Sequence, residues 1–358
     1  MNENISRNFS KPGLSGIMRV KNDASFIEAS VKSCIDALDE LIIVWNDCSD
    51  NSAEVIEKMR SLYPDKIKTF EYKHKVYSVN LRRDEYEVAR SLPEDSPHLL
   101  CNYYNFALSK VSCLYAMKID ADQMYFEEKL RLIRNALLRK SRVGIAVLVG
   151  FLLYCLYRIS FHVNRAFRKV LNIYGPGIPN WLSKCYDAYA VYMTQRGKGA
   201  ISLSGINVFK DGNWCVSLGK KSDIANVLPP FNGEYDHLIF KVTNDCRYVP
   251  LDSSFYNELR NDNYTYIEAF KCPYSPIPMG FYWYHLNSMR DSIRNRILKA
   301  KDLIPQAFCS LEDLKNEKFS NLKKKIGLEM CPMNTLTLAC FNYAKDKKSI
   351  AMYKSILE

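Results

Sequence analysis

Apolar residues along the first 125 positions follow two alternating spacings, and each spacing predicts one kind of element. Four short apolar runs contain β-branched residues and predict strands, at 15–20, 40–45, 67–72 and 113–119. Three intervening stretches have helical spacing, at 25–38, 53–63 and 99–111. Ser25 is the expected N-cap of the first helix, with Glu28 completing a capping box. Because strands and helices alternate, the pattern predicts an α/β fold with a mostly parallel sheet.

Polar clusters follow three of these predicted strands. They read KNDA at 21–24, NDCSDNS at 46–52 and DADQ at 120–123. Ligands of open α/β sheets bind at the carboxyl ends of the strands, so we expect the three clusters to converge on one crevice. The chain contains neither the G-x-G-x-x-G fingerprint nor a P-loop. Carboxylates and amides suit a metal ion and hydroxyl-bearing ligands better than bare phosphate.

The second half of the chain has less regular patterning. Residues 199–209 and 213–218 predict further strands. The segment GEYDH places Glu234, Asp236 and His237 in a turn before another apolar run. Residues 272–285 predict a proline- and aromatic-rich loop ending at His285, and the chain from Asp291 onward is expected to be mainly helical.

Charge is unevenly distributed along the sequence. The net charge is +11, and no acidic residue occurs between Glu128 and Asp187, a stretch with eleven Lys or Arg residues. Its centre, residues 143–157, is an uncharged apolar run. Fifteen helical residues reach only about 22 Å, less than the roughly 30 Å of a bilayer core. We therefore expect a segment that dips into or lies along an anionic leaflet; the alternative is a buried helix with a solvated basic collar.

Composition sets the broad class of protein. With 358 residues, 47% hydrophobic and 25% charged, the chain is expected to be globular rather than disordered. Its beginning lacks the layout of a secretory signal. The twelve cysteines include no C-x-x-C pair, which favours reduced thiols in a cytoplasmic protein. Nucleic-acid binding is disfavoured, because the basic residues flank an apolar run and do not alternate with exposed aromatics.

Asp120 and Asp122 are the main candidates for metal chemistry. In an extended chain, side chains two residues apart point the same way, so both carboxylates could bind one cation. Oxygen ligands favour Mg²⁺ or Mn²⁺, which can also bridge the diphosphate of a nucleotide sugar. The alternative is a solvated strand end with an Asx turn.

Four segments, in this order and spacing, resemble the GT-A fold glycosyltransferases: GIMRVKNDASFIEASVKSC, VWNDCSDNS, NYYNFALS and MKIDADQMYF. The resemblance is particularly to bacterial enzymes of lipooligosaccharide and O-antigen assembly, the β-1,4-N-acetylgalactosaminyltransferases. It covers residues 16 to about 132 and resumes weakly at NVFKDGNW and GEYDHLIF. It implies a GT-A, Rossmann-like domain that binds a nucleotide sugar.

The resemblance also implies roles for individual residues. The uridine and ribose pocket would contain residues that follow the first two strands and the DADQ strand: Arg19, Lys21, Asn22, Asn46, Asp47, Asp50 and Asp120. Asp122, with Asp120, would bind the metal ion. His285 would complete the metal site, with His237 as a second choice. NDCSDNS is one residue shorter than the commoner family turn, so Asn46 and Asp47 both remain candidates for reading the base.

The implied reaction is inverting, with a carboxylate that deprotonates the acceptor hydroxyl. Asp236 is favoured as this base and Glu234 is the alternative, because Tyr235 stands where the family carries a second acid. The expected domain layout is a catalytic domain at 12–285, an insert at about 137–198 without a family counterpart, and a helical region at 286–358.

The expected function is transfer of a sugar from a UDP-sugar, with UDP-GalNAc favoured, to a lipooligosaccharide, O-antigen or capsule-type acceptor. Mn²⁺ or Mg²⁺ is the expected cofactor, and the inner face of the plasma membrane the expected peripheral location. The alternatives are a UDP-galactose or UDP-glucose transferase of the same fold and a non-catalytic membrane-tethered scaffold.

Overall fold

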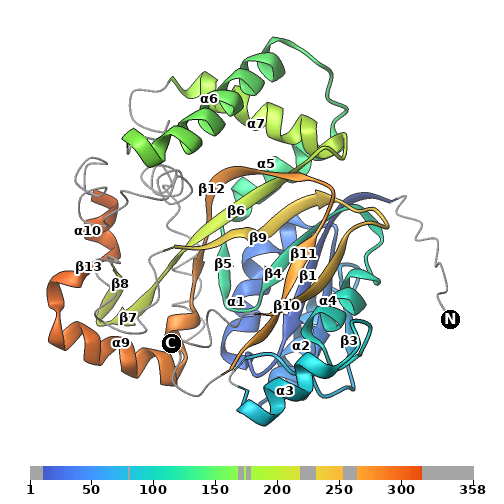
Figure 1. The fold of residues 1–358 in the computed structure, drawn as a ribbon, viewed down its shortest axis with the longest axis vertical. Helices are drawn as coiled ribbons and strands as arrows, with labels where there is room; N and C mark the ends of the chain where they lie inside the picture. Colours follow the sequence, from blue (N-terminus) through green and yellow to red (C-terminus); the bar gives the residue numbers. More distant parts are fainter. Residues whose placement is uncertain are drawn as a thin grey trace. The chain divides into compact units, whose positions relative to one another are not determined.

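The computed structural model describes residues 11–79, 81–167, 173–174, 179–217, 231–252 and 264–316. The chain divides into two compact units, each assembled from separated segments. Unit 1 contains residues 1–31, 38–121 and 241–274, and unit 2 contains residues 32–37, 122–240 and 275–358. Figure 1 shows the elements of both units.

Unit 1 is built on four parallel strands. They are β1 (Lys11–Val20), β2 (Glu40–Trp45), β3 (Ile67–Glu71) and β4 (Cys113–Asp120), in the order β3-β2-β1-β4. The connecting helices are α1 (Ala24–Cys34), α2 (Ser52–Leu62), α3 (Arg83–Ser91) and α4 (Leu100–Leu108). Strand β2 is buried on both faces, as its unbroken apolar run predicts. The expected α/β class and the four predicted strands are confirmed.

The start of α1 differs from the sequence prediction. The helix begins at Ala24, and the carbonyl of Asp23 accepts hydrogen bonds from the amides of Phe26 and Ile27 at 2.8 and 3.2 Å. Ser25 therefore lies inside the helix, and the prediction that it is the N-cap is wrong. The cause is tertiary, because the amide of Asp23 donates to Ser52 Oγ at 2.9 Å and so holds the chain there.

An antiparallel hairpin completes unit 1. Strands β10 (Arg247–Asp252) and β11 (Tyr266–Lys271) pair with each other and pack on α4. Asn105 of α4 exchanges two hydrogen bonds of 2.8 Å with the backbone of Tyr248, and the rings of Tyr104 and Tyr248 stack at 4.7 Å. The hairpin thereby brings Glu268, from late in the chain, close to Lys118 of β4.

Unit 2 contains the strands β9 (Phe231–Lys241), β6 (Gly199–Asn207), β12 (Ser275–His285) and β5 (Gln123–Tyr125), in that order. Strand β12 is parallel to β6, whereas β5 and β9 are antiparallel to their neighbours. The prediction of an aromatic loop before His285 is wrong, because residues 277–284 are buried in β12. Register shifts near Pro278 accommodate the prolines, which lack an amide donor.

The predicted turn at GEYDH is also wrong, because these residues lie within β9. Leu203 of β6 pairs with His237, and Gly205 pairs with Asn232. Residues 233–236 therefore stand opposite the single residue Ser204, which makes this part of β9 a wide irregularity. A polar sequence that suggests a turn is thus accommodated as a bulge in a strand.

Three helices of unit 2 are α5 (Glu127–Leu138), α6 (Ile145–Phe167) and α7 (Asn180–Gln195). Helix α7 contacts the sheet, where the Tyr186 hydroxyl donates to the carbonyl of Pro278 at 3.0 Å. Helix α6 packs on α7 at Gly150, where an added Cβ would lie 2.1 Å from the carbonyl oxygen of Cys185. Figure 1 shows α6 and α7 as a pair in green. Within the described residues, no helix combines the length and the hydropathy required to cross a bilayer.

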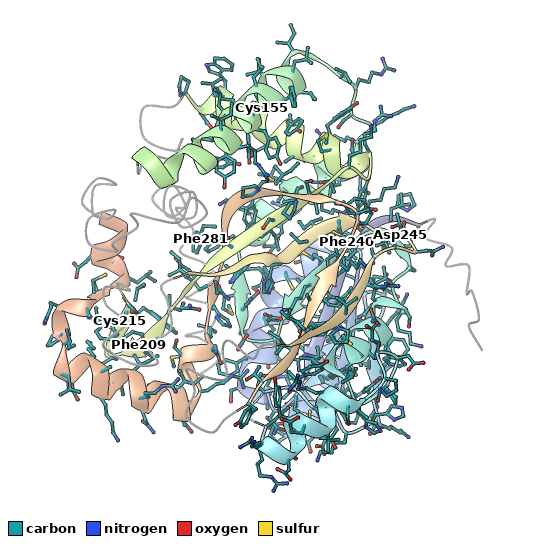
Figure 2. The ribbon with its side chains drawn as sticks, in the orientation of Figure 1. Cys155, Phe209, Cys215, Phe240, Asp245 and Phe281 are labelled. Atoms are coloured by element: carbon teal, nitrogen blue, oxygen red, sulfur yellow. The ribbon has the colours of Figure 1, made fainter. Side chains whose placement is uncertain are left out.

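A smaller cluster lies around β7 (Phe209–Asp211) and β8 (Asn213–Ser217). Strand β8 pairs with β7 on one side and with β13 (Phe308–Ser310) on the other. The remaining elements of this late part of the chain are η2 (Asn287–Met289), α9 (Asp291–Leu303), η3 (Pro305–Ala307) and α10 (Leu311–Asn316). Phe209 and Cys215, labelled in Figure 2, are buried with Ile297 and Phe308. The described part of the predicted helical C-terminal region therefore contains a short strand as well, and residues 317–358 lie outside the described residues.

Candidate active site

Arg19 lies at the carboxyl end of β1, against the aromatic side chains of α4. Its guanidinium carbon is 5.8 Å from the ring centre of Tyr103 and 5.2 Å from that of Tyr104. Burial by itself lowers the pKa of Arg19, but the neighbouring Tyr104 and the Glu268 carboxylate outweigh it and hold the pKa above its ordinary value. Arg19 is therefore a permanent cation at the strand end.

Asp120 ends β4 and stands opposite Arg19 in the parallel register. Lys118 Nζ is 3.9 Å from Asp120 Oδ1 and 3.9 Å from Glu268 Oε1. Two cations and two carboxylates thus share this corner of unit 1. Lys118 and Glu268 were not predicted as site residues, because Glu268 comes from the β10–β11 hairpin, far from β4 in the sequence.

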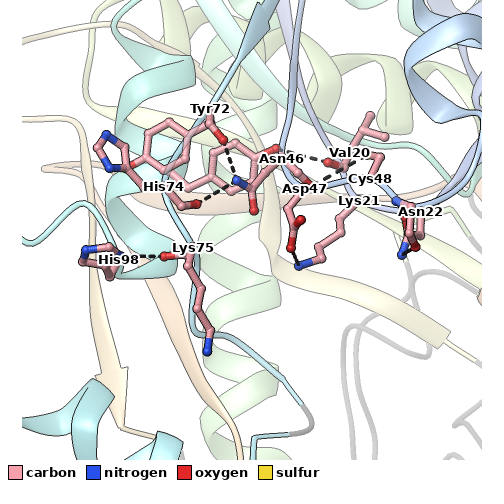
Figure 3. A network of polar contacts seen from close by, with 12 residues as sticks. Val20, Lys21, Asn22, Asn46, Asp47, Cys48, Tyr72, His74, Lys75 and His98 are labelled. Carbon is pink, nitrogen blue, oxygen red and sulfur yellow. Dashed lines mark hydrogen bonds and ion pairs between the residues drawn. The ribbon is translucent and has the colours of Figure 1, made fainter.

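Figure 3 shows the polar contacts of Asn46 and Asp47, the two candidates for reading the base, whose side chains differ strongly in exposure. Asn46 is 1% exposed, and its amide donates to the carbonyls of Tyr72 and His74. Asp47 has an exposed side chain that pairs with Lys21 Nζ at 3.2 Å. Asp47 also adopts a left-handed backbone conformation, with φ of 45°. Asn46 therefore braces the segment after β3, whereas Asp47 and Lys21 are accessible to a ligand.

Asn22 and Asp50 are held in local hydrogen bonds. Asn22 donates to Ser49 Oγ at 3.1 Å and accepts from the Ser49 amide at 2.8 Å. Asp50 accepts from the amides of Ala24 and Ser52 at the starts of two helices. Burial by itself raises the pKa of Asp50, but these bonds and one from the Ser52 side chain hold it below its ordinary value. Both carboxylate oxygens of Asp50 thus accept hydrogen bonds from backbone amides of this loop region. The role of Asp50 in nucleotide binding stays a prediction.

The paired carboxylates are not on one extended strand. Strand β4 ends at Asp120, and Asp122 lies in the turn that leads to β5. The carbonyl of Asp122 accepts a hydrogen bond from the amide of Leu286 at 2.7 Å, which fixes the turn. The expectation that both side chains point the same way from an extended strand is therefore wrong. The turn instead places Asp122 beside the end of β12.

Asp122 lies beside two basic side chains of unit 2. Asp122 Oδ1 is 3.2 Å from His285 Nε2, and Asp122 Oδ2 is 3.1 Å from Arg290 Nη2. The carboxylate is largely buried, at 10% side-chain exposure. The sequence prediction paired Asp122 with His285, and the structure brings the two together. Arg290 was missed, because an arginine that begins a helix carries no distinguishing signal in the sequence.

His285 contacts Asn207 through Nδ1 and faces Asp122 through Nε2. His285 Nδ1 is 2.6 Å from Asn207 Oδ1, so Nδ1 carries a proton and donates it to that oxygen. In the neutral ring, Nε2 then presents a lone pair to a carboxylate oxygen only 3.2 Å away. At 3.2 Å, Nε2 is placed either to donate a proton to Asp122 Oδ1 or to share a metal cation with it.

A carboxylate and an imidazole whose other nitrogen is hydrogen-bonded form a donor set that suits Mn²⁺. Two protein ligands are few, and within the described part of the chain no group of three His, Cys, Asp or Glu residues could hold a metal ion. Asp122 and His285 would thus supply only two ligands, and a divalent cation bound there would take its remaining ligands from water or from a substrate diphosphate.

The other predicted residues of unit 2 have different surroundings. His237 is 2% exposed, and its Nε2 lies 3.0 Å from Nε2 of Gln123. Its ring packs against Trp283 at 4.7 Å, so His237 is part of the core near β12. The side chains of Glu234 and Asp236, the two candidate bases, lie outside the described residues.

The comparisons agree with the glycosyltransferase resemblance in the first part of the chain. Residues 8–146 match the model of the family described as β-1,4-N-acetylgalactosaminyltransferase (CgtA). This match includes β1 to β5, with Asp120 and Asp122. The predicted family resemblance and the enzyme class, a glycosyltransferase, are confirmed by it. No protein of curated function matches the sequence.

Several solved glycosyltransferases are similar at low identity. Glucosyl-3-phosphoglycerate synthase from Mycobacterium tuberculosis, with Mn²⁺ and UDP-glucose, is 15% identical over 31% of this chain and 33% of its own, with a TM-score of 0.20. Mannosyltransferase PcManGT from Pyrobaculum calidifontis, with GDP-Man and Mn²⁺, is 15% identical over 96% of this chain and 79% of its own, with a TM-score of 0.33. S. aureus TarS is 12% identical over 96% of this chain and 54% of its own, with a TM-score of 0.32. All three TM-scores lie below 0.5, so these similarities are too slight to assign a substrate.

Proposed function

We propose that the protein is an inverting glycosyltransferase that transfers a sugar from a UDP-sugar, UDP-GalNAc being favoured. The acceptor is a glycan of the lipooligosaccharide, O-antigen or capsule type, at the inner face of the plasma membrane. The observation that carries the proposal is the pair of Asp122 and His285, whose facing atoms lie 3.2 Å apart, close enough to share one cation. The family match over residues 8–146 supports the reaction class and the favoured sugar.

Asp122 and His285 hold Mn²⁺ or Mg²⁺ in this proposal, and Asp120 contributes to the metal or the ribose. The bound cation supplies Lewis-acid stabilisation of the departing UDP. Asn207 keeps Nε2 of His285 directed at the site by accepting the proton of Nδ1. Arg290, whose Nη2 is 3.1 Å from Asp122 Oδ2, pairs with that carboxylate and would supply a further cation to the diphosphate.

The nucleoside is bound by unit 1. Asp47 reads the base and Lys21 contacts the ribose or phosphate, because their side chains are exposed and already adjacent. Asn46 acts indirectly, by holding the backbone of Tyr72 and His74 beside the pocket. Arg19, Asn22 and Asp50 complete the pocket, Arg19 as its buried cation.

Asp236 is the proposed base for the acceptor hydroxyl, with Glu234 as the alternative. We expect Asp236→Asn to retain UDP and Mn²⁺ affinity within about twofold while transfer falls by 10² or more, because a general base contributes about this factor. The rate is measured by release of UDP with acceptor present, and affinity by calorimetry. The matched variant Glu234→Gln keeps transfer. A loss of donor affinity in Asp236→Asn would instead indicate a ligand role.

Calorimetry with UDP tests the metal site. Wild-type protein is expected to bind UDP at least tenfold more tightly with Mn²⁺ than with EDTA, whereas Asp122→Asn and His285→Gln lose this difference. The control Asp245→Asn changes an exposed aspartate of unit 1, labelled in Figure 2. This variant should retain the difference in UDP affinity between Mn²⁺ and EDTA. Equal UDP affinity with and without Mn²⁺ in wild-type protein would refute the proposal and favour a non-catalytic scaffold.

The donor sugar is identified by a separate screen. UDP-GalNAc, UDP-galactose and UDP-glucose are incubated with the protein and Mn²⁺, and UDP release is measured. Fastest hydrolysis of UDP-GalNAc is expected. Faster hydrolysis of UDP-galactose or UDP-glucose would leave the proposed reaction class unchanged but would show that UDP-GalNAc is not the preferred donor.

A further inference from the structure

Helix α6 presents an apolar face to solvent. Five large side chains at spacings of three and four residues, here called the α6 stripe, are between 53% and 82% exposed: Ile145, Leu148, Leu152, Leu156 and Ile159. Residues at these spacings share one face of a helix. The stripe is contiguous and contains no polar residue. Proteins in water rarely expose such a contiguous apolar surface unless it binds a partner.

The opposite face of α6 is already used for packing. Val147 and Tyr157 are 8% and 2% exposed, and Gly150 allows close approach to the backbone of α7. The rings of Phe151 and Tyr154 contact Tyr189 of α7 at 5.7 and 5.4 Å. Helix α7 in turn bonds to β12 through Tyr186. These contacts fix the rotation of α6 on α7, with the stripe directed away from α7.

Exposed cations flank the stripe. Arg139, Lys140 and Arg142 precede the helix and are exposed; Arg158, also exposed, lies within it on the side of Tyr154, 6.0 Å from that ring centre. The surrounding sequence has no acidic residue between Glu128 and Asp187. An apolar face bordered by cations is complementary to an anionic lipid leaflet, which offers acyl chains below a negatively charged surface. A second copy is a poorer partner, because apposed stripes would bring like charges together.

We propose that the α6 stripe inserts into the interfacial layer of an anionic phospholipid membrane, with α6 lying parallel to the membrane plane. The flanking arginines and lysines contact lipid phosphates, and α7 connects α6 to the sheet of unit 2. This inference deepens the proposed function, since it rests on an acceptor presented at a membrane, and it identifies the surface and orientation of contact. It also agrees with the absence, among the described helices, of one able to cross a bilayer.

The test is co-sedimentation of the full chain with vesicles, without any sugar nucleotide. The probes are vesicles of phosphatidylglycerol and phosphatidylcholine and vesicles of phosphatidylcholine alone. The stripe variant is Leu148→Glu/Leu152→Glu/Leu156→Glu. Its matched control is Leu62→Glu/Val88→Glu/Leu303→Glu, which adds the same charge at exposed apolar positions of three other helices.

We expect wild-type protein to bind the anionic vesicles at least tenfold more tightly than the neutral ones. The affinity of the stripe variant for the anionic vesicles should be at least tenfold lower than that of wild type, and the affinity of the control should stay within twofold of wild type. Equal binding by wild type and stripe variant would overturn the proposal. A wild-type protein that ignores vesicles but forms dimers that the stripe variant dissociates would also overturn it, and would make the stripe an interface between copies.

Two measurements on the same samples keep these outcomes separable. Thermal unfolding shows whether the stripe variant is folded, and Mn²⁺-dependent UDP binding in solution shows whether the candidate active site is intact. A variant that binds UDP normally and no longer binds vesicles supports the membrane surface. Vesicle binding without UDP binding in wild type would refute the proposed function and leave the membrane surface standing.

Discussion

Asn207 contacts Nδ1 of His285 and leaves Nε2 facing Asp122, and its effect can be measured separately from that of the two proposed metal ligands. Asn207→Leu removes the acceptor for Nδ1–H, so the imidazole loses its orientation and tautomer. We expect Mn²⁺ affinity in the presence of UDP to fall about 10- to 100-fold. Asn207→Asp retains an acceptor and should restore the affinity. If both variants bind Mn²⁺ as wild type does, Asn207 does not position His285.

A second residue-scale prediction concerns Glu40, a buried carboxylate of unit 1. It accepts hydrogen bonds from Ser15 at 2.6 Å, Lys68 at 2.7 Å and the amide of Ser112 at 2.6 Å. Burial by itself raises the pKa of Glu40, but these bonds outweigh it and lower the pKa to about 2. The stabilisation is therefore complete above the unfolded pKa of about 4.3 and is lost as pH falls toward about 2.

Glu40→Gln is expected to lower the free energy of unfolding by about 2 kcal/mol at pH 7. This value is below the full linkage energy because the partner Lys68 is half exposed and screened by water. At pH 3 the difference from wild type should shrink, as measured by urea unfolding at both pH values. The control Glu94→Gln changes an exposed carboxylate and should show no such pH dependence. A difference that is constant from pH 7 to pH 3 would contradict the assignment.

At the scale of elements, the contact between α6 and α7 depends on Gly150. An added Cβ would lie 2.1 Å from a backbone oxygen of α7, which cannot move as a flexible side chain can. Gly150→Ala is therefore expected to destabilise the protein by about 1–3 kcal/mol, despite the better helix propensity of alanine. The control Gly144→Ala meets no atom within 4 Å and should change stability by less than about 1 kcal/mol. Equal urea midpoints for the two variants would contradict this packing.

Elements were predicted well where local pattern and burial agree. The strands of unit 1 occur where β-branched apolar runs predict them, because a parallel strand covered on both faces needs a continuous apolar sequence. The β12 strand was missed because prolines and aromatics suggest a loop, whereas its place between β6 and β5 buries both faces. The β10–β11 hairpin was missed because its partner surface on α4 is distant in sequence.

At the scale of the whole molecule, the proposed membrane contact of the α6 stripe would link catalysis to location. If the stripe holds the enzyme at a membrane, an acceptor in the same membrane is reached at a higher effective concentration. Transfer to a lipid-linked glycan in anionic vesicles should therefore exceed transfer to the same glycan free in solution by tenfold or more. The stripe variant should lose this advantage while its rate with the free glycan is unchanged. Identical rates for both acceptors in wild type would contradict this link.

The sequence alone determined the α/β class, the parallel strands of unit 1, the polar clusters at their ends and the glycosyltransferase resemblance, because these depend on local pattern. It also singled out Asp122 and His285. Only the tertiary structure decided that Asp122 lies in a turn, that Asn207 and Arg290 join it, that Asn46 is buried while Asp47 is exposed, and that α6 directs an apolar stripe to solvent. Each of these depends on contacts between residues far apart in the chain, which periodicity does not encode.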